Sequence, residues 1–314
     1  MSRNDPVKAL STGACCSHAD GVRLALIACR STPTNDALSD APADGLTWEP
    51  MTPRRALEVL RPGDAALGRL DVLPTLDGMD DGLWALGALA ARGVHVLNDP
   101  AALLAAHDKL LTARVLRRRA VVHPATIHVR NGRAVPRPPH PVVLKPRYGS
   151  WGREVHRCDE AASLSEALAR VRANSWDIRH GALVQELVTP QGYDLRVLVA
   201  AGRIVGAVYR VAAEGEWRTN VALGGVRRPV LDPPRAASGV ALAAARAIGA
   251  ALVGVDLLPD GLGGWVVAEL NGAVEFTTEY APGGDVFAET SLALAREARA
   301  RRELRAAFAS PAAA

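Results

Sequence analysis

The chain has 314 residues, of which 37 are lysine or arginine and 33 are aspartate or glutamate. A net charge of +4, with only 4% of aromatic residues, argues against a surface that binds nucleic acids. The sequence has no run of about 18 apolar residues that could cross a membrane, and its N-terminal segment lacks the apolar core of a signal peptide. We therefore expect a soluble, cytoplasmic protein with two or three domains.

Lysine and cysteine are both rare in this chain. Lysine occurs only at Lys8, Lys109 and Lys145, whereas arginine supplies nearly all of the positive charge. Lys8 lies in the polar stretch of residues 1 to 20, which we expect to be a disordered tail, so the other two lysines need a specific explanation. The cysteines have neither a metal-binding nor a redox spacing and are too few for a disulfide framework, so we expect reduced thiols.

Residues 21 to 98 alternate between strand-type and helix-type patterns. Apolar runs predict three strands, at residues 22–28, 64–70 and 94–97. Thr52-Pro53 has the sequence of a helix start, and Asp81 opens a second helix that Gly93 ends. Because strands alternate with helices, this part of the chain is predicted to form a small parallel α/β domain.

The next segment predicts two helices, followed by a strand that carries a lysine. Asp99-Pro100 and Asp108 each have the sequence of a helix start, and we expect this helical pair to connect two domains. The run Val142 to Pro146 is an apolar strand except for Lys145. A lysine is rarely buried without a partner, so its place in this strand points to a function.

Small residues at Gly149, Ser150 and Gly152 follow that strand. They allow backbone N–H groups to crowd against an anion, as in phosphate-binding loops. A glycine-containing hairpin turn without a ligand fits the same pattern, and the sequence alone leaves both interpretations open.

Beyond this loop the pattern predicts two α+β halves. The expected elements are a helix capped by Asp159, a strand at 182–188, a hairpin of 194–199 and 204–211, a helix at 235–250, a strand pair within 253–276 and a long helix from Asp285. Each half contributes a polar loop, which suggests a ligand held between the two halves.

The predicted strand pair within residues 253–276 carries an acidic side chain in each apolar run. Side chains alternate between the two faces of a strand, so Glu269 and Asn271 share a face. If the two strands pair, Asp256 reaches the same face. Three oxygen donors on rigid strands suit Mg²⁺. A solvated polar face is the alternative, although a carboxylate within the run Val253 to Leu258 is an unusual choice for it.

Taken together, these segments resemble the ATP-grasp ligases of the RimK-like glutamate-ligase branch, which contains ribosomal-protein-modifying and lysine-biosynthesis enzymes. The resemblance covers residues 95 to 295, and more loosely the segment before them. The matching segments, in the order of the family, are Asp108-Lys109, Val143 to Pro146, Gly149 to Gly152, Val184 to Val188, Gly192 to Val197, Arg210, Trp217 to Asn220, Gly224-Gly225, Gly254 to Asp256 and Glu269 to Asn271. No single segment is specific, but their common order is.

The resemblance implies an ATP-grasp fold of mixed α/β and α+β class, in which two subdomains clasp ATP. It implies a small N-terminal α/β domain at residues 21–98, a helical connector and first subdomain at 99–188, and a second subdomain with the metal site and a C-terminal helix at 189–314. The implied activity is ATP-dependent ligation of a carboxylate to an amine through an acyl phosphate, with ADP as a product. The implied cofactors are ATP and two Mg²⁺ ions, with Mn²⁺ as an alternative.

The resemblance also implies roles for individual residues. The implied ATP-binding residues are Lys109, Lys145, Gly149, Ser150, Gly152, Gln185, Glu186, Leu187, Val188, Asp194 and Thr219. The implied catalytic residues are Arg210, Arg218 and Asn220, and we expect at least one of the two arginines to hold the substrate carboxylate. The implied metal ligands are Asp256, Glu269 and Asn271. A lysine ammonium acts as a point charge against phosphate, which agrees with the sparing use of lysine. For Asp194, an ion pair with Arg196 is an equally good interpretation.

The substrates are less well defined. We expect a small-molecule or peptide acid and amine, with glutamate or another amino acid among the candidates and a carrier protein as an alternative acceptor. The ending Asn271-Gly-Ala-Val-Glu275-Phe276 is closer to the lysine-biosynthesis enzymes. The competing class is an inactive nucleotide-binding regulatory protein of the same fold, which should lack a metal ligand or a phosphate-binding lysine, and none is missing. We expect no nucleic-acid or membrane partner, and a homo-oligomer is left open.

Overall fold

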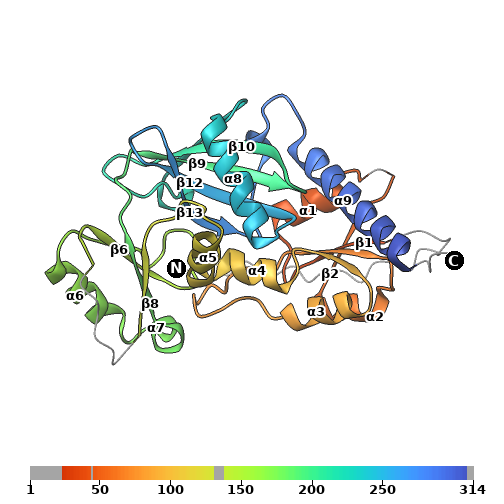
Figure 1. Cartoon of the computed structure of the whole chain (residues 1–314), viewed down its shortest axis with the longest axis horizontal. Coiled ribbons are helices and arrows are strands. Elements are labelled where there is room, and N and C mark those ends of the chain that lie inside the picture. Colours follow the sequence, from red (N-terminus) through yellow and green to blue (C-terminus); the bar gives the residue numbers. More distant parts are fainter. Residues whose placement is uncertain (1–22, 44, 131–137, 310–314) are drawn as a thin grey trace, which may run out of the picture.

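The computed structural model describes residues 23–43, 45–130 and 138–309, which form three sheets and their covering helices (Figure 1). The expected tail at residues 1–20, with Lys8, lies outside these ranges. Among the described residues, no helix has both the length and the apolar character needed to span a membrane.

The N-terminal sheet is parallel, with the strand order β2-β1-β3-β4. Its elements are β1 (Leu24–Ile27), α1 (Pro33–Asp40), β2 (Trp48–Met51), α2 (Pro53–Val59), β3 (Ala65–Gly68), α3 (Leu83–Ala91) and β4 (His95–Leu97). The predicted parallel arrangement of β1, β3 and β4 and the start of α2 at Thr52-Pro53 are confirmed. Helix α1 and strand β2 were not predicted, because α1 is short and polar and β2 has only two buried residues, with glutamate and proline between them.

Two helices connect this sheet to the rest of the chain, as predicted. They are α4 (Pro100–His107) and α5 (Lys109–Arg118), capped by the side chains of Asp99 and Asp108. The Asp108 carboxylate accepts hydrogen bonds from the backbone N–H groups of Leu110 and Leu111. It also accepts one from Arg147 Nε at 2.6 Å. The cap therefore fixes Lys109 as the first residue of α5, beside the loop that follows Lys145.

The central sheet is antiparallel, with the strand order β5-β8-β6-β7. Its elements are β5 (Thr126–Val129), β6 (Val142–Pro146), β7 (His156–Cys158), α6 (Ala161–Val171), α7 (Ser175–His180) and β8 (Ala182–Glu186). Glu160 precedes α6 as its cap, so the prediction that Asp159 is the cap is wrong by one residue. The central sheet and α6 enclose a core of their own, which contains Leu144, Leu168 and Val184.

The terminal sheet is also antiparallel, with the strand order β11-β10-β9-β12-β13. Its elements are β9 (Tyr193–Ala200), β10 (Arg203–Val211), β11 (Val226–Pro229), α8 (Arg235–Ile248), β12 (Leu252–Pro259) and β13 (Trp265–Asn271), and the helix α9 (Val286–Ala309) follows. The predicted pairing of β12 with β13 is confirmed. Short 3-10 helices lie at Val221–Leu223 and Thr278–Tyr280.

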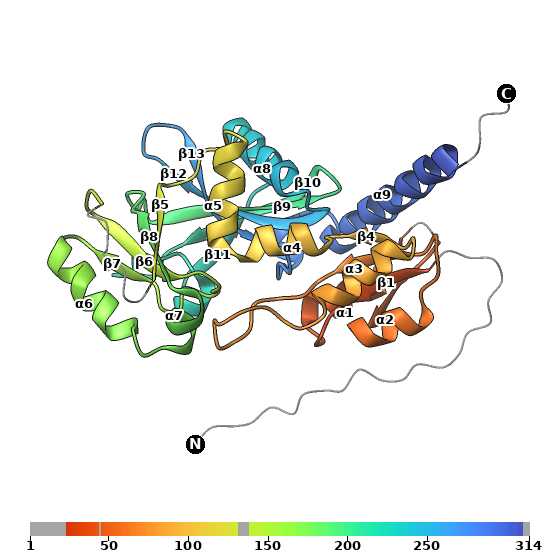
Figure 2. The same cartoon turned by 60° about the horizontal axis from the view of Figure 1, so that its bottom comes forward.

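The two faces of the terminal sheet have different partners. One face packs on the alanine-rich side of α8. On the other face, Leu198 and Leu252 share a core with the N-terminal sheet and α9. Figure 2 shows α9 lying above β4 and α3 of the N-terminal domain. The segment after β13 crosses this face closely, since a Cβ on Gly254 would lie 2.5 Å from a Val274 methyl group.

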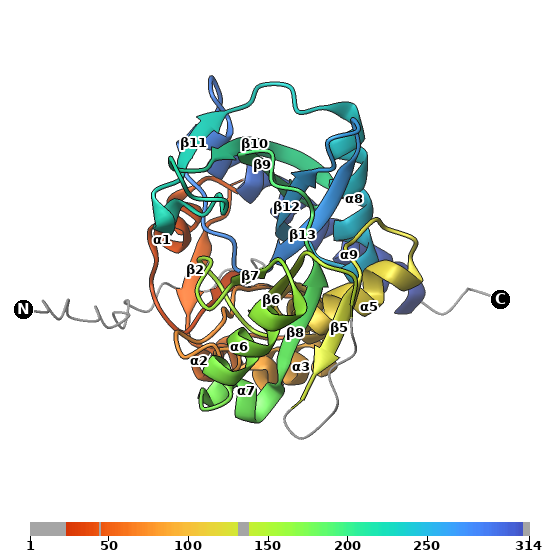
Figure 3. The ribbon, with the colours of Figure 1, turned by 90° about the vertical axis from the view of Figure 1, so that its left-hand side faces the viewer.

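The N-terminal and terminal sheets are therefore joined by one core, whereas the central sheet has a separate core. In Figure 3 the strands β12 and β13 of the terminal sheet lie above β6 and β8 of the central sheet. The polar half of the terminal sheet faces the strand that carries Lys145.

Candidate active site

A pocket between the central and terminal sheets collects nearly all of the residues predicted for the site. It is lined by every predicted ATP-binding residue, by Arg210, Arg218 and Asn220, and by Asp256 and Glu269. Asn271 does not line this pocket. It lines an adjoining pocket that also contains Ser150, Arg210, Asn220 and Glu269. The sequence therefore predicted which residues the fold brings together, while the assignment of their roles is a separate question.

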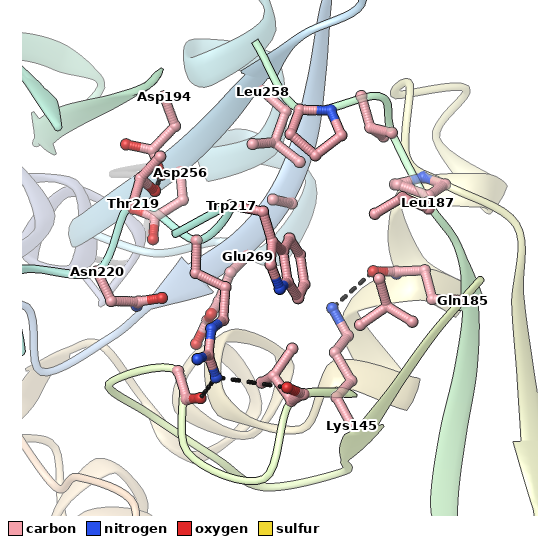
Figure 4. Close-up of a pocket in the computed structure, with 18 of the residues that line it drawn as sticks. Lys145, Gln185, Leu187, Asp194, Trp217, Thr219, Asn220, Asp256, Leu258 and Glu269 are labelled. Carbon is pink, nitrogen blue, oxygen red and sulfur yellow. Dashed lines mark hydrogen bonds between the residues drawn. The ribbon is translucent and has the colours of Figure 1, made fainter. Parts of the chain in front are cut away.

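Two buried lysines meet in the pocket. Lys145 on β6 donates from Nζ to Gln185 Oε1 at 2.6 Å (Figure 4). Lys109 Nζ donates to the Gly149 carbonyl oxygen at 2.6 Å and lies 3.1 Å from Glu269 Oε1. Burial and the neighbouring charge of Lys109 lower the pKa of Lys145 to about 8. Two ammonium groups held this close inside the protein indicate a site for an anion.

The loop between β6 and β7 closes one side of the pocket. Arg218 Nη1 donates to the carbonyl oxygens of Gly152 and Val155, at 3.0 and 3.4 Å. The remaining guanidinium nitrogens of Arg218 bind Glu216 at 3.0 and 2.8 Å. Gly152 has a φ of +69°, and a Cβ there would lie 2.6 Å from Asn220 Oδ1. The loop therefore needs glycine at the point where it meets Asn220.

The opposite end of the pocket is more apolar. Leu187 and Val188 follow β8, and Leu258 of β12 faces them across the pocket. In Figure 4, the Trp217 ring projects between the Lys145 side and the Asp256 side of the pocket. An apolar end beside a cationic end suits a ligand with a flat ring at one end and negative charge at the other.

A row of ion pairs crosses the polar face of the terminal sheet. Arg210 of β10 pairs with Asp194, its cross-strand neighbour on β9, at 2.8 Å from Nε. Arg210 Nη2 also contacts Asp256 Oδ2 at 2.8 Å. Arg196 of β9 holds both oxygens of Asp256 at 2.6 and 2.7 Å. Thr219 donates to Asp194 at 2.6 Å. The predicted alternative of an Asp194–Arg196 pair is wrong, because β9 presents Arg196 to β12 and Asp194 to β10.

The predicted metal ligands share one face of β12 and β13. Asp256 lies directly opposite Glu269 in the antiparallel pair, and a β-bulge follows. Burial disfavours the charged form of Asp256, but Arg196 and Arg210 outweigh it and hold the pKa of this carboxyl well below its usual range. The buried Nδ2 of Asn271 has no hydrogen-bond partner within the described ranges.

The oxygens of these side chains have the chemistry that a hard divalent cation needs. The unpaired atom of Asn271 is Nδ2, an N–H donor, so its partner would be an acceptor such as a phosphate oxygen. The part of the chain that the structure describes has no cluster of three or more His, Cys, Asp or Glu side chains suited to a metal ion. A metal site here would rest on two carboxylates and one amide oxygen, supplemented by oxygens of a bound ligand.

Sequence reasoning missed several residues of these pockets. The sequence prediction gives Arg196 only as an ion-pair partner of Asp194 and gives Trp217 no role of its own, although both residues line these pockets. Asp71 follows β3 of the N-terminal sheet and lines the adjoining pocket. No local signal in the sequence connects Asp71 with residues near Glu269, because only the tertiary fold brings them together.

A model of the RimK-like ATP-grasp domain matches residues 106–286. The chain belongs to this family of ATP-dependent ligases.

Named relatives and solved structures agree with this assignment. The chain is 31% identical over 188 residues to the alpha-aminoadipate–LysW ligase LysX of Saccharolobus solfataricus, covering 59% of this chain and 68% of that protein. It is 29% identical over 220 residues to the glutamate–LysW ligase ArgX of Sulfurisphaera tokodaii, covering 68% and 78%. The D-alanine–D-alanine ligase of Bacillus anthracis superposes with a TM-score of 0.67 at 15% identity, over 91% of this chain and 100% of that one.

The predicted family and the predicted ATP-grasp fold are therefore confirmed. As a member of this family, the chain is an ATP-dependent, ADP-forming carboxylate–amine ligase.

Proposed function

We propose that the pocket between the central and terminal sheets binds ATP with its phosphates between Lys109, Lys145 and the loop Gly149 to Gly152. The adenine ring would lie at the apolar end, against the segment Gln185 to Val188. The two buried ammonium groups, one of them with a lowered pKa, support the position of the phosphates. Leu187, Val188 and Leu258 support the position of the base.

We propose that Asp256, Glu269 and Asn271 hold two Mg²⁺ ions, with Mn²⁺ as an alternative. When bound, such ions would neutralise charge on the phosphates and act as Lewis acids on the transferred phosphoryl group. Arg196 and Arg210 keep the Asp256 carboxylate ionised, which is the form that a cation requires. The two arginines also keep this carboxylate fixed on the face of the sheet.

The arginines predicted as catalytic both have protein partners in this structure. Arg210 contacts Asp194 and Asp256, and Arg218 contacts the loop carbonyls and Glu216. We propose that Arg210 orients the metal-binding carboxylate and that Arg218 holds the loop over the phosphates. In that arrangement the loop excludes water, which would otherwise hydrolyse an acyl phosphate. Asn220, in contact distance of the loop at Gly152, positions the same segment.

For the substrates, we propose that one is an amino acid. Relatives of this chain are named as ligases that join alpha-aminoadipate or glutamate to LysW, and another is named as a tetrahydromethanopterin:alpha-L-glutamate ligase. The second substrate is then a small molecule, a peptide or a carrier protein with a free carboxylate or amine. In either case the acid would be activated as an acyl phosphate and the amine would displace phosphate from it.

The observation that carries this proposal is the meeting of Lys109, Lys145 and Glu269 in one pocket beside a glycine loop. The test is ADP release by the purified protein with a panel of acids and amines, together with product mass. Adding hydroxylamine traps an acyl phosphate as a hydroxamate. ATP binding without ADP release under any condition would instead indicate the inactive regulatory protein.

A further inference from the structure

A second pocket adjoins the nucleotide pocket and faces the N-terminal sheet. Glu269 belongs to both pockets, so a ligand in the second one lies beside the phosphate end of the first. On the side of the terminal sheet it is lined by Arg196 and Arg227. On the other side it is lined by Asp71 and Glu275. Arg210 and Glu269 of the terminal sheet also line it. We call this second pocket the dipolar groove, because arginines of the terminal sheet and the carboxylates of Asp71 and Glu275 both line it.

Asp71 occupies a position where α/β sheets commonly bind ligands. Strand β3 ends at Gly68, and Asp71 follows at the carboxyl end of this parallel strand. Ligands bind in open α/β sheets outside the carboxyl ends of the strands. Glu275 reaches the same place from the segment after β13, and both carboxylates also line a narrow recess behind the groove. The N-terminal sheet therefore contributes an anionic wall to a pocket beside the phosphates.

The recess has more negative than positive charge. Three carboxylates line it, those of Asp71, Asp80 and Glu275, against the two guanidinium groups of Arg30 and Arg69. Arg30 contacts Asp71 at 3.2 Å and Asp80 at 3.4 Å, and Arg69 contacts Glu275 at 3.3 Å. Burial raises the pKa of Asp71 and of Asp80, as expected where a carboxylate lacks full compensation. An incoming cation would supply the missing charge.

Several polar atoms of this recess lack a partner. Glu275 Oε1 accepts hydrogen bonds from Thr32 and Arg69, but Oε2 accepts none from the residues that the structure describes. Among the described residues, Asp71 Oδ2 accepts only from Arg30, at 3.2 Å, and a carboxylate oxygen can accept a second bond. Arg69 is 3% exposed, and its Nη1 has no partner within the described ranges. Of these atoms only Arg69 Nη1 is buried, and as an N–H donor it needs an acceptor. The two carboxylate oxygens lie on partly exposed side chains, so they can accept hydrogen bonds from a ligand that reaches the recess.

The opposite side of the groove offers cations. Arg227 pairs with Glu279 at 3.3 Å, and both side chains are partly exposed. Such a pair contributes little to stability and exchanges easily for another carboxylate. Arg196 is less exposed than Arg227, and its guanidinium is paired with the Asp256 carboxylate. A ligand that bridges the groove therefore meets donors for a carboxylate on one side and acceptors for an ammonium on the other.

We propose that Asp71 and Glu275 bind the ammonium group of an amino-acid substrate, whose carboxylate lies toward Arg196 and Arg227. The inference rests on the proposed function, and it adds the two residues that select for an amine. An ammonium accepts the looser geometry of these carboxylates, since each of its N–H bonds can find a separate oxygen.

The experiment measures binding, so that it does not depend on which substrate group reacts. Calorimetry with a non-hydrolysable ATP analogue and Mg²⁺ gives the affinity for L-glutamate, L-2-aminoadipate and the other amino acids of a screening panel. Each ligand is compared with its analogue that lacks the amine, such as glutarate for glutamate. The variants are Asp71→Asn and Glu275→Gln, and Glu58→Gln serves as a control that removes an exposed carboxylate from α2.

We expect at least one amino acid to bind about ten- to a hundredfold more tightly than its analogue, as for a charge-assisted hydrogen bond. Asp71→Asn and Glu275→Gln should each reduce this preference by a similar factor. Affinity for the ATP analogue should stay within about twofold of the wild type, as it should for Glu58→Gln. Glu275 is largely outside the core, so its variant tests the inference even if Asp71→Asn fails to fold.

Equal binding of an amino acid and its analogue overturns the inference, and so does an unchanged preference in both variants. Absence of binding by every amino acid also overturns it. The separate assay of ADP release then decides the proposed function. In that case, ADP release with acids that lack an amine supports the proposed ligase function without the ammonium site. If no acid or amine causes ADP release, both the ligase function and the ammonium site are contradicted.

Discussion

The lowered pKa of Lys145 predicts that ATP affinity falls in alkaline solution. In the ligand-free protein, burial and Lys109 lower the pKa of Lys145 to about 8, from the ordinary lysine value of 10.5. A triphosphate beside the ammonium favours its charged form and raises the pKa again. Binding at pH 9 therefore has to begin by protonating Lys145. The expected cost is about tenfold in affinity for each pH unit above the free pKa, until the pKa of the complex is reached.

The stability of the ligand-free protein should depend on pH in the opposite direction. The folded pKa of Lys145 lies below the unfolded value, so the unfolded chain binds more protons between about pH 8 and 10.5. The free energy of unfolding contributed by this residue therefore rises with pH across that interval and is constant below it. Lys145→Gln removes the titrating group and serves as the reference for both effects.

Calorimetry at pH 7 to 10, in buffers of different ionisation enthalpy, counts the protons taken up with the nucleotide. We expect the wild type to take up close to one proton more than Lys145→Gln near pH 9. Thermal unfolding of both proteins without nucleotide gives the matching stability curves. The reasoning is refuted if wild type and Lys145→Gln lose ATP affinity in parallel, or if proton uptake is the same in both.

Three further predictions concern the phosphate and metal side of the pocket. Glu269→Gln should lower turnover about a thousandfold or more while leaving the far-ultraviolet spectrum unchanged, and near-normal kinetics would contradict its metal role. Lys145→Arg should bind the nucleotide more weakly than the wild type, because a planar guanidinium does not replace the compact charge of an ammonium beside Gln185. An unchanged affinity by calorimetry would mean that Lys145 has only a structural role in its strand. Arg218→Ala should lower kcat/KM about ten- to a hundredfold for ATP and for the acid alike, because Arg218 holds the carbonyl of Gly152. A loss confined to the acid would return Arg218 to the predicted role of a substrate ligand.

Much of the nucleotide pocket could be predicted because its residues lie in local segments with recognisable order. Alternation along β13 placed Glu269 and Asn271 on one face, and the turn after Pro259 was enough to pair β12 with β13. The caps of α4 and α5 were predicted from single aspartates, since a short side chain before a helical run satisfies the first free N–H groups.

What the sequence could not provide were contacts that depend on strand order. The hairpin of β9 and β10 is local, but β12 joins β9 across a long intervening segment that includes α8. Because of this pairing, Arg196 contacts Asp256, whereas Asp194 contacts Arg210. Asp71 was missed for the same reason, because its position in the groove follows from the packing of two sheets. Helix α1 was missed because its sequence is polar and its buried residues are few.

The ion pairs on the terminal sheet are better explained by function than by stability. Burying charges costs desolvation energy that ion pairs often only recover, so four charged groups on one face are a weak source of stability. They lie on the sheet that shares a core with the N-terminal sheet, which holds Asp256 in a fixed place. Lys145 and the glycine loop belong to the central sheet, whose core is separate. The bond from Arg218 Nη1 to the Gly152 carbonyl oxygen therefore links the terminal sheet to the glycine loop across the pocket, where neither sheet's core holds that loop in place.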